Sequence, residues 1–388
     1  MIATVRNRCK NKINYCFNKL KYPVFSGYFV KQHTSFMGLK LFALYLVLGF
    51  ISLDTERSKT KVPVSLHLET VIADSDDAIL GRFGGATITQ KGEILFTDAS
   101  LKTVLVFNSE GDYITKFGRE GRGPGEFQIP KATTTDKDGF IYVEDFINTR
   151  ISVWYPDFTY YSDIPFRSGW GTHFLINKNH LLIFTKPFAP LQNGYDAVII
   201  SKINRNNKEA SPFFLYEIRD WFEENLLFVS ASKLAITDSD IIVSTGKIDQ
   251  YPLRLINLNG DVLKEFGKNS DLVFYTEEEM QLRIDYANNI NPEAARIIAQ
   301  GRRYKHIYSN IEICSQNWLW VHRNKEFGAR DELDIYSLDG EYKTMVTIPP
   351  SDNELQMLGI YGEKVLFHVT TPTGEERLHV YRIEYSDE

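Results

Sequence analysis

Short apolar runs recur along the chain, and each ends in or next to polar side chains. The six runs are ILFTD (94–98), IYVED (141–145), LLIFT (181–185), IIVST (241–245), LWVHR (319–323) and VLFHV (365–369). Runs of this length, rich in β-branched residues, predict buried strands. Their last residues lie 47, 40, 60, 78 and 46 positions apart. One blade of a β-propeller takes about 40–50 residues, so three intervals fit a blade directly and two predict insertions.

Tight hairpins follow these runs. NSEGDYITKFG (108–118) and NLNGDVLKEFG (257–267) share Asn, Gly-Asp and Phe-Gly, and SLDGEYKTMV (337–346) repeats the turn. Each predicts a strand, a turn at glycine and a second strand. We therefore predict an all-β fold, a six-bladed β-propeller of four-stranded antiparallel blades. The strands of a blade are called a to d, and the apolar runs are the b strands.

The sixth unit has only three strands before the chain ends. The stretch VSLHLETVI (64–72) predicts the missing strand, which would pair with RLHVYRIEY (377–385) and close the ring without exposed edges. The segment at 276–300 has helical composition, so we predict a helical insertion at about 271–306, between blades 4 and 5. The propeller would then span 64–388.

The N-terminal part differs from the rest in composition. Eight Lys and Arg residues and no acidic residue precede Asp54, and LFALYLVLGFISL (41–53) carries no charge. This pattern predicts an export signal. We divide it into a basic leader (1–36) that a start at Met37 would leave untranslated, a signal peptide or membrane anchor (37–53) and a linker (54–63). The run is shorter than the roughly 20 apolar residues of a full span, and no A-x-A-like cleavage site follows, so cleavage and anchoring both stay open. We expect an exported protein, periplasmic or at the cell surface.

The charge of the body limits its partners. The whole chain has 44 basic and 50 acidic residues, so removing the eight basic residues of the leader leaves 36 against 50, a net charge of −14. A body this acidic repels phosphate backbones, so we expect no nucleic-acid partner. Cys314 is the single cysteine outside the leader, which excludes a disulfide framework there and predicts a small buried side chain.

The stretch GPGEFQIPKATTTDKDGFIYVEDFINTRISVW (123–154) resembles an NHL repeat in its glycine loop, its Asp-Gly turn and the positions of Asp145, Asn148 and Arg150. The resemblance implies an exported bacterial six-bladed propeller of NHL type, a group with many lipid-anchored members of unknown activity. This chain lacks the cysteine after the apolar run that lipid anchoring uses. In such repeats the three polar residues commonly tie the loop to its own blade, so we expect a structural role for them.

The glycine-rich stretch GREGRGPGEF (118–127) lies between two predicted strands. No helix follows whose N-terminus could face a phosphate, and Gly-Lys-Ser/Thr is absent from the sequence around it. We therefore predict a connector between blades rather than a phosphate-binding loop.

One face of the propeller carries the candidate ligand residues. In an antiparallel blade the b–c loops and the connectors from strand d to the next strand a share one end. Cations and aromatic side chains gather in these loops, which suits an anionic or sugar-like ligand. The predicted ligand-binding residues are Arg122, Trp170, Lys247, Tyr251, His322, Arg323 and His368.

Two histidines raise the question of a metal. His322 and His368 occupy the same position in neighbouring b strands, and a related propeller lyase that cleaves peptidyl-hydroxyglycines uses histidines around zinc. Here only a distant Glu144 accompanies them, and a calcium site would need more ligands than Asn310 and Glu354. We therefore expect no metal and no cofactor.

The sequence contains no HExxH, CxxC or nucleophile elbow. It favours a binding or scaffold module of the cell envelope that recognises a small anionic or carbohydrate ligand, or a partner protein, over an enzyme. The alternative is a hydrolase or lyase that uses the same face. RNA binding of the NHL type comes third.

Overall fold

The computed structural model describes residues 64–386, with gaps at 167–169, 178–180, 187–195, 204–209, 219–233, 240, 245–252, 258–260, 268–270, 291, 302, 306, 327–328, 349–353 and 372. The predicted leader, apolar run and linker lie outside this range, as do Lys247 and Tyr251. Within it, no helix has both the length and the apolar character needed to cross a membrane.

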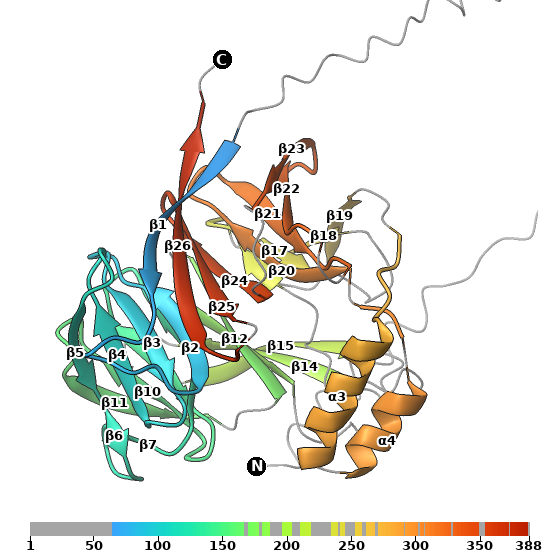
Figure 1. Ribbon diagram of the computed structural model, residues 1–388. Helices are drawn as coiled ribbons and strands as arrows, with labels where there is room; N and C mark the ends of the chain where they lie inside the picture. The colour runs from blue at the N-terminus through green and yellow to red at the C-terminus, as the bar shows by residue number, and fades with distance from the viewer. Residues whose placement is uncertain are drawn as a thin grey trace, which may run out of the picture. The chain divides into compact units, whose positions relative to one another are not determined.

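The described strands form six four-stranded antiparallel sheets, as predicted (Figure 1). Blades 1 and 2 contain β2 (Phe83–Ile88), β3 (Ile94–Asp98), β4 (Thr103–Phe107) and β5 (Tyr113–Phe117), then β8 (Pro130–Thr135), β9 (Ile141–Asp145), β10 (Arg150–Trp154) and β11 (Tyr160–Pro165). Blades 3 and 4 contain β12 (Trp170–Ile176), β13 (Leu181–Lys186), β14 (Asp196–Ile203) and β15 (Ala210–Ile218), then β16 (Leu234–Ile236), β17 (Ile242–Ser244), β18 (Leu253–Ile256) and β19 (Val262–Phe266).

Blades 5 and 6 complete the set. They contain β20 (Tyr308–Ile313), β21 (Trp318–Arg323), β22 (Glu332–Ser337) and β23 (Tyr342–Thr347), then β24 (Glu354–Tyr361), β25 (Lys364–Thr370), β26 (Glu376–Tyr385) and β1 (Val64–Ile72). The first strand of each blade contacts the first strand of the next, from β2 through β8, β12, β16, β20 and β24 back to β2. These six innermost strands therefore form a closed ring.

Closure of the ring joins the two ends of the described chain. Strand β1 pairs antiparallel with β26, from Val64 opposite Tyr385 to Ile72 opposite Leu378. In Figure 1 the blue β1 and the red β26 lie side by side. The prediction that 64–72 supplies the outer strand of blade 6 is confirmed. Leu66, Thr70 and Ile72 of β1 are buried, while Val71 and Leu68, which precedes a shift in the strand register, are exposed.

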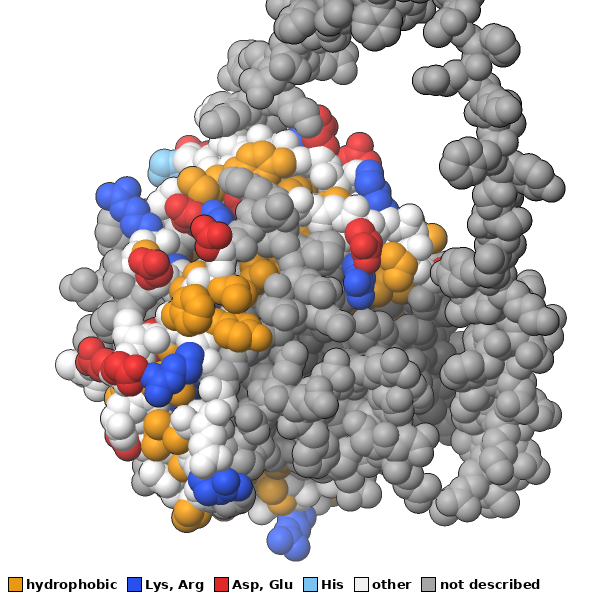
Figure 2. All heavy atoms as spheres, turned by 90° about the vertical axis from the view of Figure 1, so that its right-hand side faces the viewer, with side chains coloured by type: hydrophobic (Ala, Val, Ile, Leu, Met, Phe, Trp, Pro, Cys, Tyr) orange, Lys and Arg blue, Asp and Glu red, His pale blue; other side chains and the backbone are white. Residues whose placement is uncertain are grey.

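The helical insertion also lies where it was predicted, between β19 and β20. Helix α3 (Glu277–Ile290) begins with a capping box, in which the Thr276 hydroxyl accepts the Glu279 amide and the Glu279 carboxylate accepts the Thr276 amide. Helix α4 (Pro292–Gln300) starts with proline at its first position, where no amide hydrogen is needed. Figure 2 views the molecule from the right-hand side of Figure 1. On this face, apolar side chains are exposed between acidic and basic ones.

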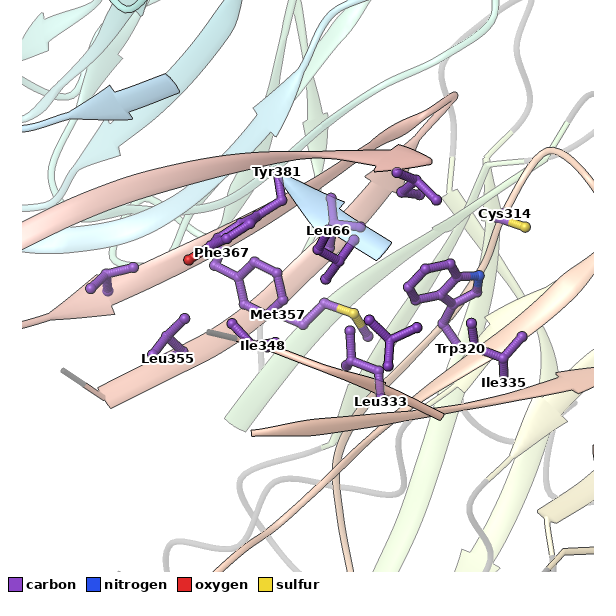
Figure 3. Packing of buried hydrophobic residues seen from close by; sticks show 14 residues of the cluster. Leu66, Cys314, Trp320, Leu333, Ile335, Ile348, Leu355, Met357, Phe367 and Tyr381 are labelled. Atoms are coloured by element: carbon purple, nitrogen blue, oxygen red, sulfur yellow. The ribbon is translucent and has the colours of Figure 1, made fainter. Parts of the chain in front are cut away.

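The core lies between neighbouring blades. The largest cluster joins blades 5 and 6, where Trp320, Met357 and Phe367 are all fully buried and, with Leu333, extend toward one another (Figure 3). Cys314 belongs to the same cluster and is 3% exposed, as the sequence predicted. Because a blade covers each side of a b strand, consecutive residues of these strands are buried, and not only alternate ones.

We predict that Ile72→Ala lowers the free energy of unfolding by about 2–5 kcal/mol, because the buried isoleucine would leave a cavity where β1 closes the ring. Ile72 is 1% exposed, whereas its neighbour Val71 is 44% exposed. Val71→Ala is the matched control and should change stability far less. Urea unfolding of both variants measures this, and equal losses would mean that the inward face of β1 does not stabilise the ring.

Candidate functional site

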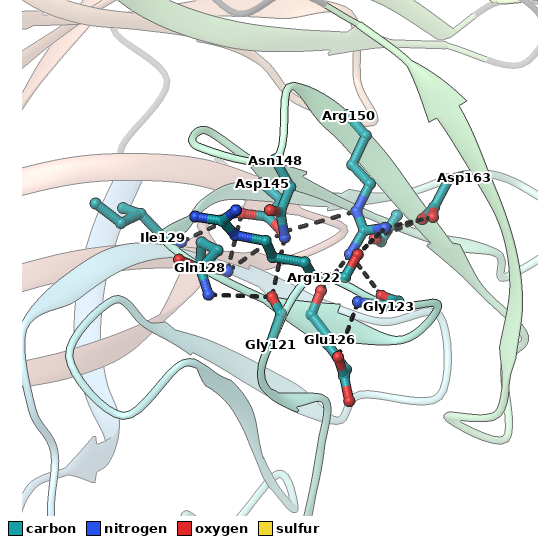
Figure 4. Close-up of polar contacts among 11 residues, drawn as sticks. Gly121, Arg122, Gly123, Glu126, Gln128, Ile129, Asp145, Asn148, Arg150 and Asp163 are labelled. Carbon is teal, nitrogen blue, oxygen red and sulfur yellow. Dashed lines mark hydrogen bonds and ion pairs between the residues drawn. The ribbon is translucent and has the colours of Figure 1, made fainter.

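The glycine-rich connector folds onto its own side chains. Strands β6 (Arg119–Glu120) and β7 (Glu126–Phe127) pair in parallel across it, and the Gly121 amide donates to the Phe127 carbonyl at 3.0 Å. The Gly123 amide donates to the Glu126 carboxylate at 2.8 Å, and this bond, helped by Arg119, lowers the pKa of Glu126. The loop thus supplies its own anion (Figure 4), and it connects β5 of blade 1 to β8 of blade 2, as predicted.

Glycine is required twice in this connector. Gly118 has φ +75° and a Cβ there would lie 2.2 Å from the Phe127 ring, while Gly121 has φ +154° and a Cβ there would lie 2.1 Å from the Glu126 carboxylate. A side chain at either position would displace the buried ring or the carboxylate that closes the loop.

Asp145 tethers the connector to blade 2. Its buried carboxylate accepts the amides of Gln128 and Ile129, and the Asn148 side-chain amide at 2.6 Å. In blade 1, Asp98 occupies the corresponding position at the end of β3 and accepts the amides of Gly81, Ser100 and Leu101. Both aspartates are fully buried. The repeated arrangement supports the structural role expected for these polar residues.

Arg150 completes the tether (Figure 4). Its guanidinium donates to the carbonyls of Gly123 and Glu126 at 2.8 and 2.5 Å, and forms an ion pair with Asp163 at 2.8 Å. A planar guanidinium with five donors suits this cluster of carbonyl and carboxylate oxygens. The Arg122 carbonyl lies within 3.4 Å of the same group, whereas the Arg122 side chain is exposed.

The predicted site residues of blade 5 take partners inside their own blade. His322 is 1% exposed, and its Nε2 lies 3.1 Å from Asp331, which also binds the Lys325 ammonium at 2.5 Å. Arg323 forms ion pairs with Glu332 and, at 2.9 Å, with Asp334, both on the neighbouring β22. These charges are therefore compensated within the blade.

His368 joins blade 6 to blade 1. Its Nε2 is hydrogen-bonded to Glu376 on β26, and its ring stacks on Phe83 of β2 with centroids 3.8 Å apart. Trp170 opens β12, opposite Lys186; its side chain lies outside the description. Among the described residues, no group of three or more His, Cys, Asp or Glu side chains is arranged to hold a metal ion.

A cavity of about 920 Å³ runs along the ring of innermost strands, and all six of these strands contribute to its wall. It begins near Phe83 and Gln356, close to the start of strands β2 and β24. At the other end its lining includes exposed residues of the a–b turns, namely Gln90, Lys137, Asp238, Gly362 and Glu363. The cavity therefore opens on the face opposite the b–c loops, and Arg122, His322, Arg323 and His368 are not part of its lining.

Polar groups from blades 5 and 6 are linked to one another in the cavity wall. The Asn310 side-chain amide donates to the Met357 carbonyl at 2.9 Å and to the Glu312 carboxylate at 3.2 Å. These contacts bridge β20 and β24 and hold the Glu312 charge against a donor. Gln356 lies in the same wall with an exposed side chain.

Sequence reasoning placed the candidate site on loops and missed this cavity. The sequence signal for the cavity was the isoleucine that ends four of the six a strands. Ile88, Ile176, Ile236 and Ile313 end their strands in the cavity wall. Isoleucine is common in any buried strand, so one strand alone does not indicate a cavity. The cavity is recognised only when the six strands are placed together in the ring.

We predict that Asp331→Asn lowers the free energy of unfolding near neutral pH by about 1–3 kcal/mol, because His322 and Lys325 lose a charged partner. Burial acts to raise the pKa of Asp331, but hydrogen bonds from His322 and Lys325 outweigh it and the pKa is lowered. A carboxyl group whose pKa is lower in the folded than in the unfolded state stabilises the fold at pH values above its unfolded pKa, which is 3.8 for Asp331. This stabilisation disappears as the pH falls through the lower folded value.

The gap in stability between wild type and variant should therefore shrink on acidification below that unfolded value. Unfolding measured across this range tests the prediction. Asp339→Asn is the control, since the pKa of Asp339 is lowered chiefly by the Ser337 hydroxyl on the surface, and its gap should stay small at every pH. A difference in unfolding free energy between wild type and Asp331→Asn that does not change with pH would contradict the pairing of ionised Asp331 with His322 and Lys325.

Comparison with known proteins agrees with this fold. The family DUF5128, described as a 6-bladed beta-propeller, matches residues 66–202. An exported protein from Bacteroides fragilis is 10% identical, with 85% of this chain and 97% of that chain covered at a TM-score of 0.55. A member of the DUF4221 family from Bacteroides vulgatus is also 10% identical, with 84% and 100% covered at a TM-score of 0.55.

Catalytically inactive virginiamycin B lyase from Staphylococcus aureus, solved with quinupristin, is 12% identical, with 82% of this chain and 99% of that chain covered at a TM-score of 0.44. A search of curated proteins found no match. At these identities the likeness concerns the fold. The chain is a six-bladed β-propeller, as its sequence predicted, and it matches the DUF5128 family over residues 66–202.

Proposed function

We propose that the chain is an exported propeller that acts as a binding module of the cell envelope and takes a small ligand into its axial cavity. The observation that carries this proposal is the cavity itself. Its volume of about 920 Å³ lies in the range of small-molecule sites, roughly 300–1,000 Å³. A closed ring of paired strands is a rigid wall, and a preformed site binds without the cost of ordering itself.

The cavity is a better candidate than the face of the b–c loops. On that face His322, Arg323 and His368 already hold acidic partners at short distance. An anionic ligand would have to displace these carboxylates. His322 is also too deeply buried to reach a ligand, so the described geometry favours binding over the hydrolase or lyase alternative.

Export is supported by the N-terminal sequence. A basic leader followed by the uncharged run at 41–53 is typical of a segment that directs a chain into or across a membrane. The propeller that follows would then lie outside the cytoplasm, where a rigid binding module can meet ligands of the envelope.

We predict that Gln356→Trp weakens ligand binding without loss of fold, because the indole would occupy part of the cavity from an exposed position in its wall. The measurement is a thermal-shift screen of envelope metabolites and glycan fragments against the wild type. Gln281→Trp, on the exposed surface of α3, is the matched control and should retain every hit. Hits whose affinity is the same for Gln356→Trp as for the wild type would place the ligand elsewhere and refute the cavity.

We also predict that a reporter fused after residue 60 is carried beyond the cytoplasmic membrane. Alkaline phosphatase, which is active only after export, should be active in this fusion, and a fusion that lacks residues 37–53 should be inactive. Mass spectrometry of the N-terminus of the mature protein distinguishes cleavage from anchoring. Phosphatase activity that does not depend on the apolar run would rule out this export signal.

A further inference from the structure

The mouth of the cavity is surrounded by aliphatic side chains from nearly every blade. Ile88, Ile176, Ile236 and Ile313 are the last residues of their a strands, and Ile360 is the last but one of β24. All five line the cavity. We call these five residues the isoleucine collar.

Blade 2 is the exception in this arrangement. Its a strand ends on Thr135, which lines the cavity as the isoleucines do. Thr135 pairs with Ile141, the first residue of its b strand, as Ile88 pairs with Ile94 and Ile313 with Leu319. The same position in the blade is therefore filled by isoleucine in blades 1 and 5 and by threonine in blade 2.

Of the collar residues, Ile88 and Ile236 are buried, whereas the other three are only partly covered by the core. Ile176, Ile313 and Ile360 each pack at the edge of a different cluster between blades, yet each stays half-buried. Since these residues also form the cavity wall, the part of each side chain that the core leaves uncovered faces the cavity. In the empty protein this apolar surface is in contact with water, which is unfavourable.

The aromatic side chains of the wall are already engaged. Phe83 stacks face to face on His368, Phe174 packs against the cluster between blades 2 and 3, and Tyr361 packs against the cluster between blades 6 and 1. A sugar ring usually binds by stacking on a free aromatic face, so the wall offers more to an aliphatic chain than to a sugar.

Charges of both signs stand outside the collar. Lys137 is exposed at the rim and forms no ion pair with another described residue, while Lys364 is paired with Glu69 at 2.8 Å. Glu363 is exposed at the same rim. A polar head group can therefore remain in this charged, hydrated rim while an apolar chain extends past it.

We infer that the isoleucine collar binds the linear aliphatic chain of an amphiphile, which enters the axial cavity from the face of the a–b turns. The inference rests on the proposed function, because it names the class of ligand for the same cavity. Binding removes the exposed isoleucine surface from water along with the chain, and each added methylene gains the free energy of its burial.

Isothermal titration of the full chain with octanoate, decanoate and dodecanoate, below their micellar concentrations, tests the inference. The dissociation constant should fall about fourfold for each added methylene. The corresponding alcohols should show the same dependence, because the collar recognises the chain and not the head group. An affinity that does not change with chain length overturns the inference.

Variants of the collar sharpen the test. Thr135→Ile completes the ring of isoleucines and should tighten dodecanoate binding by about fourfold or more, since it adds apolar surface to the wall. Thr115→Ile on β5 is the matched control, a half-buried threonine outside the cavity, and should leave the affinity unchanged. Equal effects of the two variants would contradict binding at the collar.

Replacement of a collar isoleucine by a polar residue should have the opposite effect on the affinity. Ile360→Thr should weaken dodecanoate binding by about fourfold or more, while Ile114→Thr, on the exposed face of β5, should not. If a polar compound binds and Gln356→Trp removes it while no fatty acid binds, the proposed function stands and the aliphatic class is wrong. If polar compounds and fatty acids both bind with affinities that Gln356→Trp and Ile360→Thr leave unchanged, the cavity itself is wrong.

Discussion

The pairing of β1 with β26 is the interaction on which the rest of the propeller depends. It joins residues near the two ends of the described chain, with Ile72 opposite Leu378, and so closes a loop that contains every other blade. The entropy cost of such a loop grows only with the logarithm of its length, by about 0.6 kcal/mol for each doubling. One nine-residue strand with a buried inward face can offset that cost. Without it, blade 6 would present the unpaired edge of β26.

Charged residues next to the b–c loops, which resemble a binding site in the sequence, take partners within the frame of the propeller. Asp98, Asp145 and Arg323 occupy the same position, each opposite the start of its a strand. In blades 1 and 2 the aspartate accepts amides of nearby connectors and loops, whereas in blade 5 the arginine pairs with acids of β22. The sign of the charge is reversed, yet each charged group has partners in its own blade or in the segment that leads into that blade. A buried charge must find a partner, so such residues are read better as parts of the frame than as ligand groups.

The fold was more predictable than the site, and particular residues show why. Strands such as LWVHR carry their own signal in a few consecutive positions, and the composition of 276–300 predicts the helical insertion. The partners of His322 and Arg323 depend on how β21 and β22 align, which the sequence of either strand does not reveal. The cavity depends on six strands that lie far apart in the chain. Its composition could therefore be assigned only after the ring had been assembled.

The ring imposes a further constraint on the cavity. In a less connected protein, the partly exposed Ile176, Ile313 and Ile360 would shift inward until they covered one another, because apolar side chains pack to close density. Here each innermost strand is hydrogen-bonded to the next strand of its blade and contacts the innermost strands on both sides, from β2 around to β24. The collar residues are held apart by the geometry of six blades. Without a ligand, their exposed apolar surface stays in contact with water, which is unfavourable. A ligand that covers this surface gains the free energy of its burial, and the rigid ring lowers the cost of ordering the site.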